Sequence, residues 1–260
     1  MKREKGKAAE HMAEWDRKQN RKEQLKTGAV VLAGGSGRRM KSTIPKQYMI
    51  LNGRPMITYG LEAFEKSPVD QIVLVTGEDE VEFCRNEIVA AYGFEKVKAV
   101  VPGGKERYHS VYEGLKALEG CSHVLIHDGA RPLISQRAIQ AALEGAFRYR
   151  ACVVGMPVKD TIKVSDEEEF ASNTPDRKYL WQIQTPQAFE YQLVRSCYEH
   201  LMEDIQLQQG ITDDAMVVES FSSVPVKLIR GDYSNIKVTT PEDIFVAEAL
   251  LTVREQTGQF

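Results

Sequence analysis

A glycine-rich segment near the start of the chain carries the strongest chemical signal. It reads LAGGSGRRM over 32–40 and is followed by PKQ at 45–47. Three glycines and three cations stand in or just after it: Gly34, Gly35, Gly37, Arg38, Arg39 and Lys46. Glycines let the backbone approach a ligand and turn its amide groups toward an anion, and convergent cations fit a polyphosphate. The alternative is a glycine-rich turn with basic residues on the surface.

Other nucleotide-binding motifs fit this segment less well. A P-loop requires GxxxxGK[ST], and the segment contains no GK[ST]. A dinucleotide site requires GxGxxG that runs directly into a helix, whereas Gly37 is followed by two arginines and later by Pro45. The segment therefore favours a polyphosphate site and disfavours hydride transfer.

Three further clusters stand at expected strand ends or in loops. Gly103 opens the run GGKER, which precedes a helix containing Ser110 and offers more backbone amides to a ligand. Asp128 follows a strand in HDGARP, where a carboxylate beside a polyphosphate suits Mg²⁺ or a substrate hydroxyl; otherwise it caps a turn or helix. Lys237 lies in a short apolar strand and needs an anionic partner, unless it is a surface lysine on an edge strand.

Short apolar runs alternate with amphipathic stretches, and these elements must position the clusters. Runs without polar alternation are typical of strands buried on both faces of a parallel sheet. We expect strands at 29–33, 71–76, 97–101, 123–126, 151–156, 226–229 and 236–238. We expect helices at 55–66, 79–92, 109–118, 135–147, 191–203 and 213–220, and a last helix that starts at Pro241 with Thr240 as its N-cap. The alternation predicts an α/β fold with one doubly wound, mostly parallel sheet.

The pattern changes between about 158 and 183. A polar–apolar alternation at 160–164, an acidic stretch at 166–169 and the run YLWQI predict a two-stranded antiparallel arm with an acidic tip. Because a two-stranded ribbon is marginal in water, we expect the arm to pack against a second copy of the chain.

Composition narrows the class of protein. The 260 residues carry a net charge of −3, which argues against a general nucleic-acid binder. Four cysteines show no CxxC spacing, so we expect a reducing cytoplasm and neither a zinc site nor a disulfide framework. No apolar run approaches the roughly 18 residues of a membrane span, and the charged start lacks the apolar core of a secretory signal. We expect one domain over 28–255, preceded by a charged leader at 1–27 that is a solvated helix or disordered.

Seven ordered motifs resemble those of a known enzyme family. They are LAGGSGRRM with PKQ, GGKERYHSVYEGL, HDGARP, GMPVKDTIK, TPDRKYLWQIQTPQAF, ITDDA and NIKVTTPEDI. In these motifs the chain resembles the 2-C-methyl-D-erythritol 4-phosphate cytidylyltransferases of the non-mevalonate isoprenoid pathway, over residues 28 to about 250. The resemblance implies a Rossmann-like nucleotidyltransferase sheet with an antiparallel β-arm, and Mg²⁺ as the cofactor. It also implies a reaction in which CTP and methylerythritol phosphate give the CDP-alcohol and pyrophosphate.

The resemblance assigns roles to individual residues. Charge that develops at the α-phosphorus would be stabilised by Arg39, Lys46 and Lys237. CTP would be lined by Ala33, Gly34, Gly35, Gly37, Gly103 and Ser110. Asp128 would lie near Mg²⁺ and the incoming phosphate, and the acceptor would be held by Asp128, Arg131, Thr161, Arg177, Thr185 and Thr212. In this family the arm reaches across a homodimer, so Thr161 and Arg177 would complete the neighbouring chain's site.

Two features depart from the family pattern. Many members have alanine where this chain has Gly34, and the related ribitol-5-phosphate cytidylyltransferases share the double glycine. The leader has no counterpart. Two alternatives therefore stay open: the same transfer to ribitol 5-phosphate or another polyol phosphate, and a non-catalytic nucleotide-binding module. Catalysis is favoured because a mere binder needs no cations around the α-phosphorus, and the chain retains Arg39, Lys46, Asp128 and Lys237 together.

Overall fold

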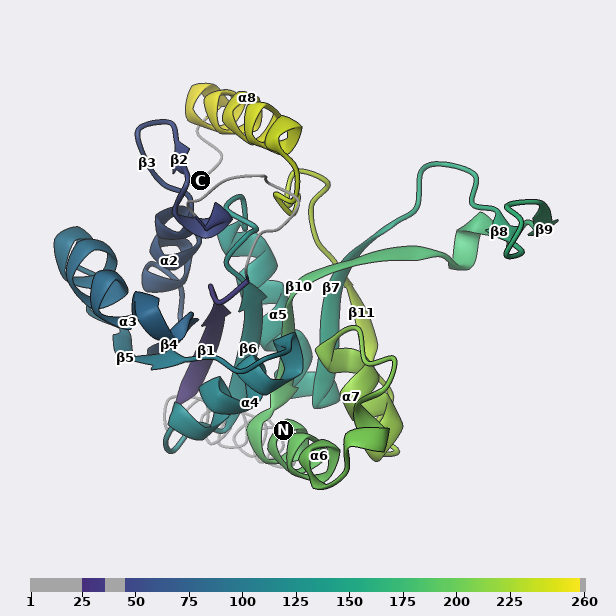
Figure 1. Cartoon of the computed structure of the whole chain (residues 1–260), viewed down its shortest axis with the longest axis horizontal. Helices are drawn as coiled ribbons and strands as arrows, with labels where there is room; N and C mark the ends of the chain where they lie inside the picture. The colour runs from purple at the N-terminus through teal and green to yellow at the C-terminus, as the bar shows by residue number, and fades with distance from the viewer. Residues whose placement is uncertain (1–24, 36–44, 258–260) are drawn as a thin grey trace, which may run out of the picture.

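A seven-stranded sheet forms the centre of the computed structural model, which describes residues 25–35 and 45–257 (Figure 1). Its strands are β1 (Thr27–Leu32), β4 (Gln71–Thr76), β5 (Val97–Pro102), β6 (His123–Asp128), β7 (Ala151–Pro157), β10 (Trp181–Glu190) and β11 (Lys227–Arg230). Their order is β11-β7-β10-β6-β1-β4-β5, and every neighbouring pair is parallel except the two that contain β10. The predicted doubly wound, mostly parallel sheet is confirmed.

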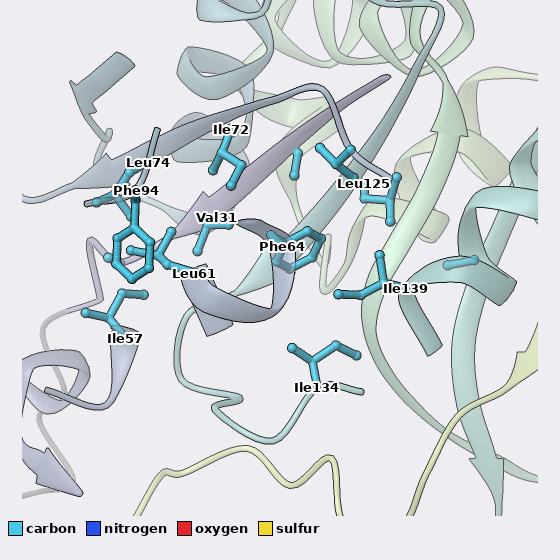
Figure 2. Close-up of a cluster of buried hydrophobic side chains, with 14 of the residues drawn as sticks. Val31, Ile57, Leu61, Phe64, Ile72, Leu74, Phe94, Leu125, Ile134 and Ile139 are labelled. Carbon is cyan, nitrogen blue, oxygen red and sulfur yellow. The ribbon is translucent and has the colours of Figure 1, made fainter. Parts of the chain in front are cut away.

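Helices cover both faces of this sheet. One face carries α2 (Ile57–Glu65), the helical turns η3 (Glu78–Glu80), α3 (Val81–Phe83) and η4 (Cys84–Ala90), and α5 (Gln136–Tyr149). The other face carries α4 (Arg107–Ala117), α6 (Tyr191–Glu203) and α7 (Asp214–Phe221). Neighbouring residues of β1 enter opposite clusters, because Val31 packs with Phe64 on the first face and Val30 packs with Leu115 on the second. Figure 2 shows the first cluster, and such two-sided burial explains why the strands are continuous apolar runs.

A third, smaller cluster holds the last helix against the body. In it α8 (Pro241–Thr257) packs against the hairpin of β2 (Ile50–Leu51) and β3 (Arg54–Pro55). The amide of Thr240 donates to Asp243 Oδ2 at 2.9 Å, which is the return bond of a capping box and agrees with Thr240 as the N-cap. Within the described residues no helix has the length and apolar character needed to cross a membrane.

The segment between β7 and β10 leaves the body as a long arm (Figure 1). It carries β8 (Val164–Ser165) and β9 (Ala171–Asn173), which pair antiparallel, and the turn η5 (Arg177–Tyr179). The predicted arm is thus present, but its expected second strand belongs to β10, which pairs with β7 and with β6 inside the main sheet. Several apolar side chains of the arm are exposed: Ile162, Val164, Phe170 and Tyr179.

Two predicted elements differ from the structure, and most of the predicted leader lies outside the described residues. The predicted strand at 236–238 is wrong, because this segment is an irregular loop that hydrogen-bonds through the Val238 amide to the Ala130 carbonyl at 2.8 Å. The helix expected at 79–92 is helical but not regular, since its longest part, η4, is π-helical. Residues 1–24 of the predicted leader lie outside the described residues.

Candidate functional site

A cavity of about 430 Å³ opens at the edge of the sheet where several parallel strands end. Leu32 and Asp128, the last residues of β1 and β6, are paired in register there. Open parallel sheets bind ligands at this edge. The residues that the sequence predicted and that line the cavity are Ala33, Gly34, Gly35, Lys46, Ser110, Asp128 and Lys237.

Close backbone packing shapes one wall of the cavity. The Ala33 amide donates to the Val75 carbonyl at 2.6 Å, and the Gly103 amide donates to the Thr76 carbonyl at 2.7 Å. A Cβ on Gly103 would lie 2.6 Å from Ser110 Oγ, so a larger residue would displace the serine. Gly103 itself does not line the cavity, but without a Cβ it lets the chain pass closely over Ser110, which does.

A hydrogen bond joins the Lys46 side chain to the loop that carries Lys237, so two of the predicted cations lie in contacting segments. Lys46 begins the short helix η2 (Lys46–Tyr48), and its Nζ donates to the carbonyl of Val238, the residue after Lys237, at 3.2 Å. The buried side chain of Gln47 donates to the Ala33 carbonyl, which ties η2 to the end of β1. The helix η2, the end of β1 and the loop that carries Lys237 thus meet around the cavity, although they are far apart in the sequence.

Asp128 is the buried carboxylate at the centre of the charges. Its Oδ1 accepts from Arg107 Nε at 3.1 Å, and its Oδ2 accepts from Lys237 Nζ at 2.6 Å. Burial raises the pKa of this carboxyl, but the neighbouring Arg107 and Lys237 outweigh burial and hold the pKa well below its usual range. Asp128 is therefore ionised across the neutral pH range.

Thr185 and His127 fix the backbone at Asp128 from behind. The Asp128 amide donates to Thr185 Oγ1 at 3.1 Å, so the Thr185 hydroxyl proton is left for His127 Nδ1 at 3.0 Å. His127 Nε2 then donates to the Arg131 carbonyl at 3.2 Å. Burial lowers the pKa of His127 to about 4, which keeps the ring neutral. Thr185, which the resemblance assigns to the acceptor, thus also supports the backbone of Asp128.

Five residues expected to hold the acceptor do not line this cavity: Arg131, Thr161, Arg177, Thr185 and Thr212. Arg131 donates to the Asn235 carbonyl at 2.7 Å and ties the loop after β6 to the loop that carries Lys237. Thr212 is exposed just before α7, and Thr161 and Arg177 are exposed on the arm. Two more predicted residues lie outside the described part of the chain: Gly37 and Arg39.

Arg107, which begins α4, is the central side chain to which the sequence analysis gave no role. Its two terminal nitrogens each donate to an oxygen of Asp214 at 2.8 Å, while its Nε contacts Asp128. Asp214 lies in the first turn of α7 and is fully buried. Both motifs were visible as GGKER and ITDDA, but 107 positions separate the partners, and one sequence does not reveal such a pair.

Comparison with known proteins decides the family. The family model for 2-C-methyl-D-erythritol 4-phosphate cytidylyltransferase matches residues 27–253. The chain belongs to this cytidylyltransferase family. A cytidylyltransferase of that name from Lachnospira eligens is 52% identical over 224 residues, 86% of this chain and 98% of the relative. One from Lachnoclostridium phytofermentans is 48% identical over 228 residues, 87% and 96% of the two chains.

Solved structures agree with this membership of the cytidylyltransferase family. The 4-diphosphocytidyl-2C-methyl-D-erythritol synthase from Anaerococcus prevotii matches with a TM-score of 0.77 at 33% identity. The match covers 88% of this chain and 97% of the other.

Removing one partner of the buried Arg107–Asp214 pair should strongly destabilise this cytidylyltransferase. We expect Arg107→Leu to lower the free energy of unfolding by about 3–5 kcal/mol, because it leaves a buried carboxylate without its cation. Adding Asp214→Asn to the same chain should restore most of that loss, as measured by urea denaturation. As a control, Lys178→Leu breaks the exposed pair with Asp176 and should leave the free energy of unfolding nearly unchanged, because solvent screens that pair. A double variant as unstable as the single one would contradict this account of the pair.

Proposed function

We propose that this chain joins CTP to 2-C-methyl-D-erythritol 4-phosphate, giving the CDP-alcohol and pyrophosphate. The family match and the names of its relatives support a nucleotidyltransferase of the non-mevalonate isoprenoid pathway with this acceptor. The main structural support for this function is one arrangement: Lys46, Arg107 and Lys237 line the same cavity at the sheet edge as Asp128.

The proposed reaction is in-line attack by the acceptor's phosphate oxygen on the α-phosphorus of CTP. A phosphate monoester is already an anion near neutral pH, so the protein need not supply a strong base. The obstacle is the repulsion between two anions, and cations placed around the phosphorus remove it. We assign this role to Lys46 and Lys237, with Arg39 as a third cation. No Ser or Cys nucleophile is required.

Asp128 prepares Lys237 for this role before the nucleotide arrives. At 2.6 Å the carboxylate holds the ammonium at the cavity, so little rearrangement is needed when phosphate replaces or joins the carboxylate. Arg107 is held in the same way, by two carboxylates. The site is thus organised by the chain itself.

We include Mg²⁺ in the proposal, bound through Asp128 and the triphosphate. Within the described residues no three acidic, histidine or cysteine side chains gather at one point, so the ion would need ligands from the nucleotide. Enzymes that handle nucleotides usually hold Mg²⁺ by one or two carboxylates plus substrate phosphates, and an ionised Asp128 fits that pattern. When bound, the ion would neutralise phosphate charge.

We propose that the working enzyme is a cytoplasmic homodimer built through the arm. Exposed apolar residues on the arm, such as Phe170 (67%) and Tyr179 (74%), favour burial against a second copy. On this view Thr161 and Arg177, which lie outside their own chain's cavity, serve the partner's acceptor site. Four buried free cysteines agree with a reducing compartment, and the net charge of −3 argues against a nucleic-acid partner.

A choice of acceptors tests the proposed function. With CTP and Mg²⁺, we expect pyrophosphate release with methylerythritol phosphate to exceed that with ribitol 5-phosphate by at least about 30-fold in kcat/KM, because a polar pocket rejects a mismatched hydroxyl pattern. A preference for ribitol 5-phosphate would establish the alternative acceptor. Binding of CTP without release of pyrophosphate in the presence of any acceptor would establish a non-catalytic module.

The Lys46 side chain should act mainly in the transition state. We expect Lys46→Ala to lower kcat by roughly 30- to 1000-fold, corresponding to about 2–4 kcal/mol, while the KM for the acceptor changes by less than about 3-fold. Steady-state kinetics would measure both. Lys98→Ala, on the edge strand β5, is the matched control and should leave both constants unchanged, since Lys98 does not line the cavity and donates to the Glu95 carbonyl. Near-normal turnover of Lys46→Ala would refute the role of this lysine.

Mixing two variants tests whether the arm serves the partner's site. Arg177→Ala should weaken acceptor binding and Lys237→Ala should abolish turnover. If the arm acts across the dimer, re-associated mixtures contain one intact site per heterodimer and should regain about a quarter of wild-type activity. If Arg177 acts in its own chain, both sites of the heterodimer are damaged and no activity returns. Activity would be measured at an acceptor concentration below the KM of the Arg177→Ala variant.

A further inference from the structure

We propose that Tyr198 is a positioning residue for cytidylyl transfer: its hydroxyl orients the Asp214 carboxylate, which in turn aims Arg107 at Asp128 in the cavity. The inference rests on the proposed function and deepens it. Tyr198 lies on α6, belongs to the apolar cluster on the second face of the sheet and does not line the cavity. Its effect on the reaction would pass through two other side chains.

The first step is the contact between Tyr198 and Asp214. The Tyr198 hydroxyl donates to Asp214 Oδ1 at 2.6 Å, and both side chains are fully buried. Burial raises the pKa of this tyrosine well above its usual value, so it remains a neutral donor. The ring is held by apolar packing against residues such as Val194 and Leu201, which fixes the place from which the hydroxyl donates.

The second step is the orientation of the Asp214 carboxylate. The terminal torsion of an aspartate is broad, so packing of the chain alone does not set the plane of the carboxylate. Oδ1 accepts from both Tyr198 and Arg107, and Oδ2 accepts from Arg107 at 2.8 Å. Since Tyr198 is the donor held rigidly by the core, its bond selects the rotation at which Arg107 can make both contacts.

The third step carries this orientation into the cavity. A guanidinium is planar and rigid, so fixing its terminal nitrogens on Asp214 also fixes its Nε. That Nε lies 3.1 Å from Asp128 Oδ1, while the other oxygen of Asp128 holds Lys237 at 2.6 Å. A hydroxyl in the core thereby sets where two cations and a carboxylate stand. Removing it changes no charge, only the placement of charges.

A second buried tyrosine on the same helix separates this role from a purely structural one. Tyr191 donates to the carbonyls of Leu115 and Leu118 at 2.8 and 3.1 Å. These contacts secure the far end of α4 and involve no side chain of the charged network. Tyr191→Phe therefore removes a comparable buried hydroxyl without touching the path to Arg107.

The test compares Tyr198→Phe and Tyr191→Phe by steady-state kinetics with CTP, Mg²⁺ and methylerythritol phosphate, beside the wild type. Because misplacement acts on the transition state, we expect Tyr198→Phe to lower kcat by about 5- to 30-fold and to change the KM for CTP by less than about 3-fold. Tyr191→Phe should keep kcat within about 2-fold, although both variants lose some thermal stability.

A double variant checks the path. Asp214→Asn disturbs the carboxylate itself, so adding Tyr198→Phe to it should lower kcat by less than about 2-fold further. Should Tyr198→Phe fail to fold at the assay temperature, the same comparison with Tyr191→Phe is made at a lower temperature, at which far-UV circular dichroism matches that of the wild type.

Several outcomes would overturn the inference. They are a wild-type kcat in folded Tyr198→Phe, equal losses in the two tyrosine variants, or full independence of Tyr198→Phe and Asp214→Asn. Absence of turnover in the wild type would instead overturn the proposed function, and the inference with it.

Discussion

The ion pairs around Asp128 are the constraint on which the pocket depends. A site for a triphosphate needs several cations close together, and cations without partners at the edge of a core are costly. Here Asp128 and Asp214 provide two negative charges that match Arg107 and Lys237. The network can therefore exist in the empty enzyme, fully paired, and its members are already at the cavity when a polyanion enters.

The topology explains how such a network is assembled from distant parts of the chain. Asp128 ends β6, Arg107 begins α4, and Lys237 lies in the loop after β11. Parallel strands end at one edge, so the segments that follow them are neighbours in space although dozens of residues separate them in sequence. Lys46 joins this group through its bond to the Val238 carbonyl, in the loop of Lys237. The edge of the sheet is thus where the chemistry is concentrated.

Much of the fold could be predicted because strands that are buried on both faces of the sheet appear in the sequence as continuous apolar runs. The strand at 71–76 and the helix at 191–203 have the predicted bounds. The segment 236–238 was predicted as a strand because Ile236 and Val238 are apolar, but these residues pack in the cluster that contains α8 and not in a sheet. A short apolar run indicates burial and does not show which element covers it. The inner half of β10 was missed because Pro186 and Gln187 are atypical of a central strand.

The candidate site could likewise be predicted only in part. Residues beside glycines or at strand ends, such as Gly34, Lys46 and Asp128, could be predicted, because their local sequence is distinctive. The role of Asp214 could not, since it depends on a contact with Arg107. In β10, Trp181 pairs with Pro157 at the base of the arm, and Gln187 pairs with Ile126 of β6, the strand that ends in Asp128. One strand therefore runs from the base of the arm to Thr185, whose hydroxyl oxygen accepts from the Asp128 amide at 3.1 Å. In the proposed homodimer, the strand that supports Asp128 would therefore also be the strand that anchors the contact with the partner.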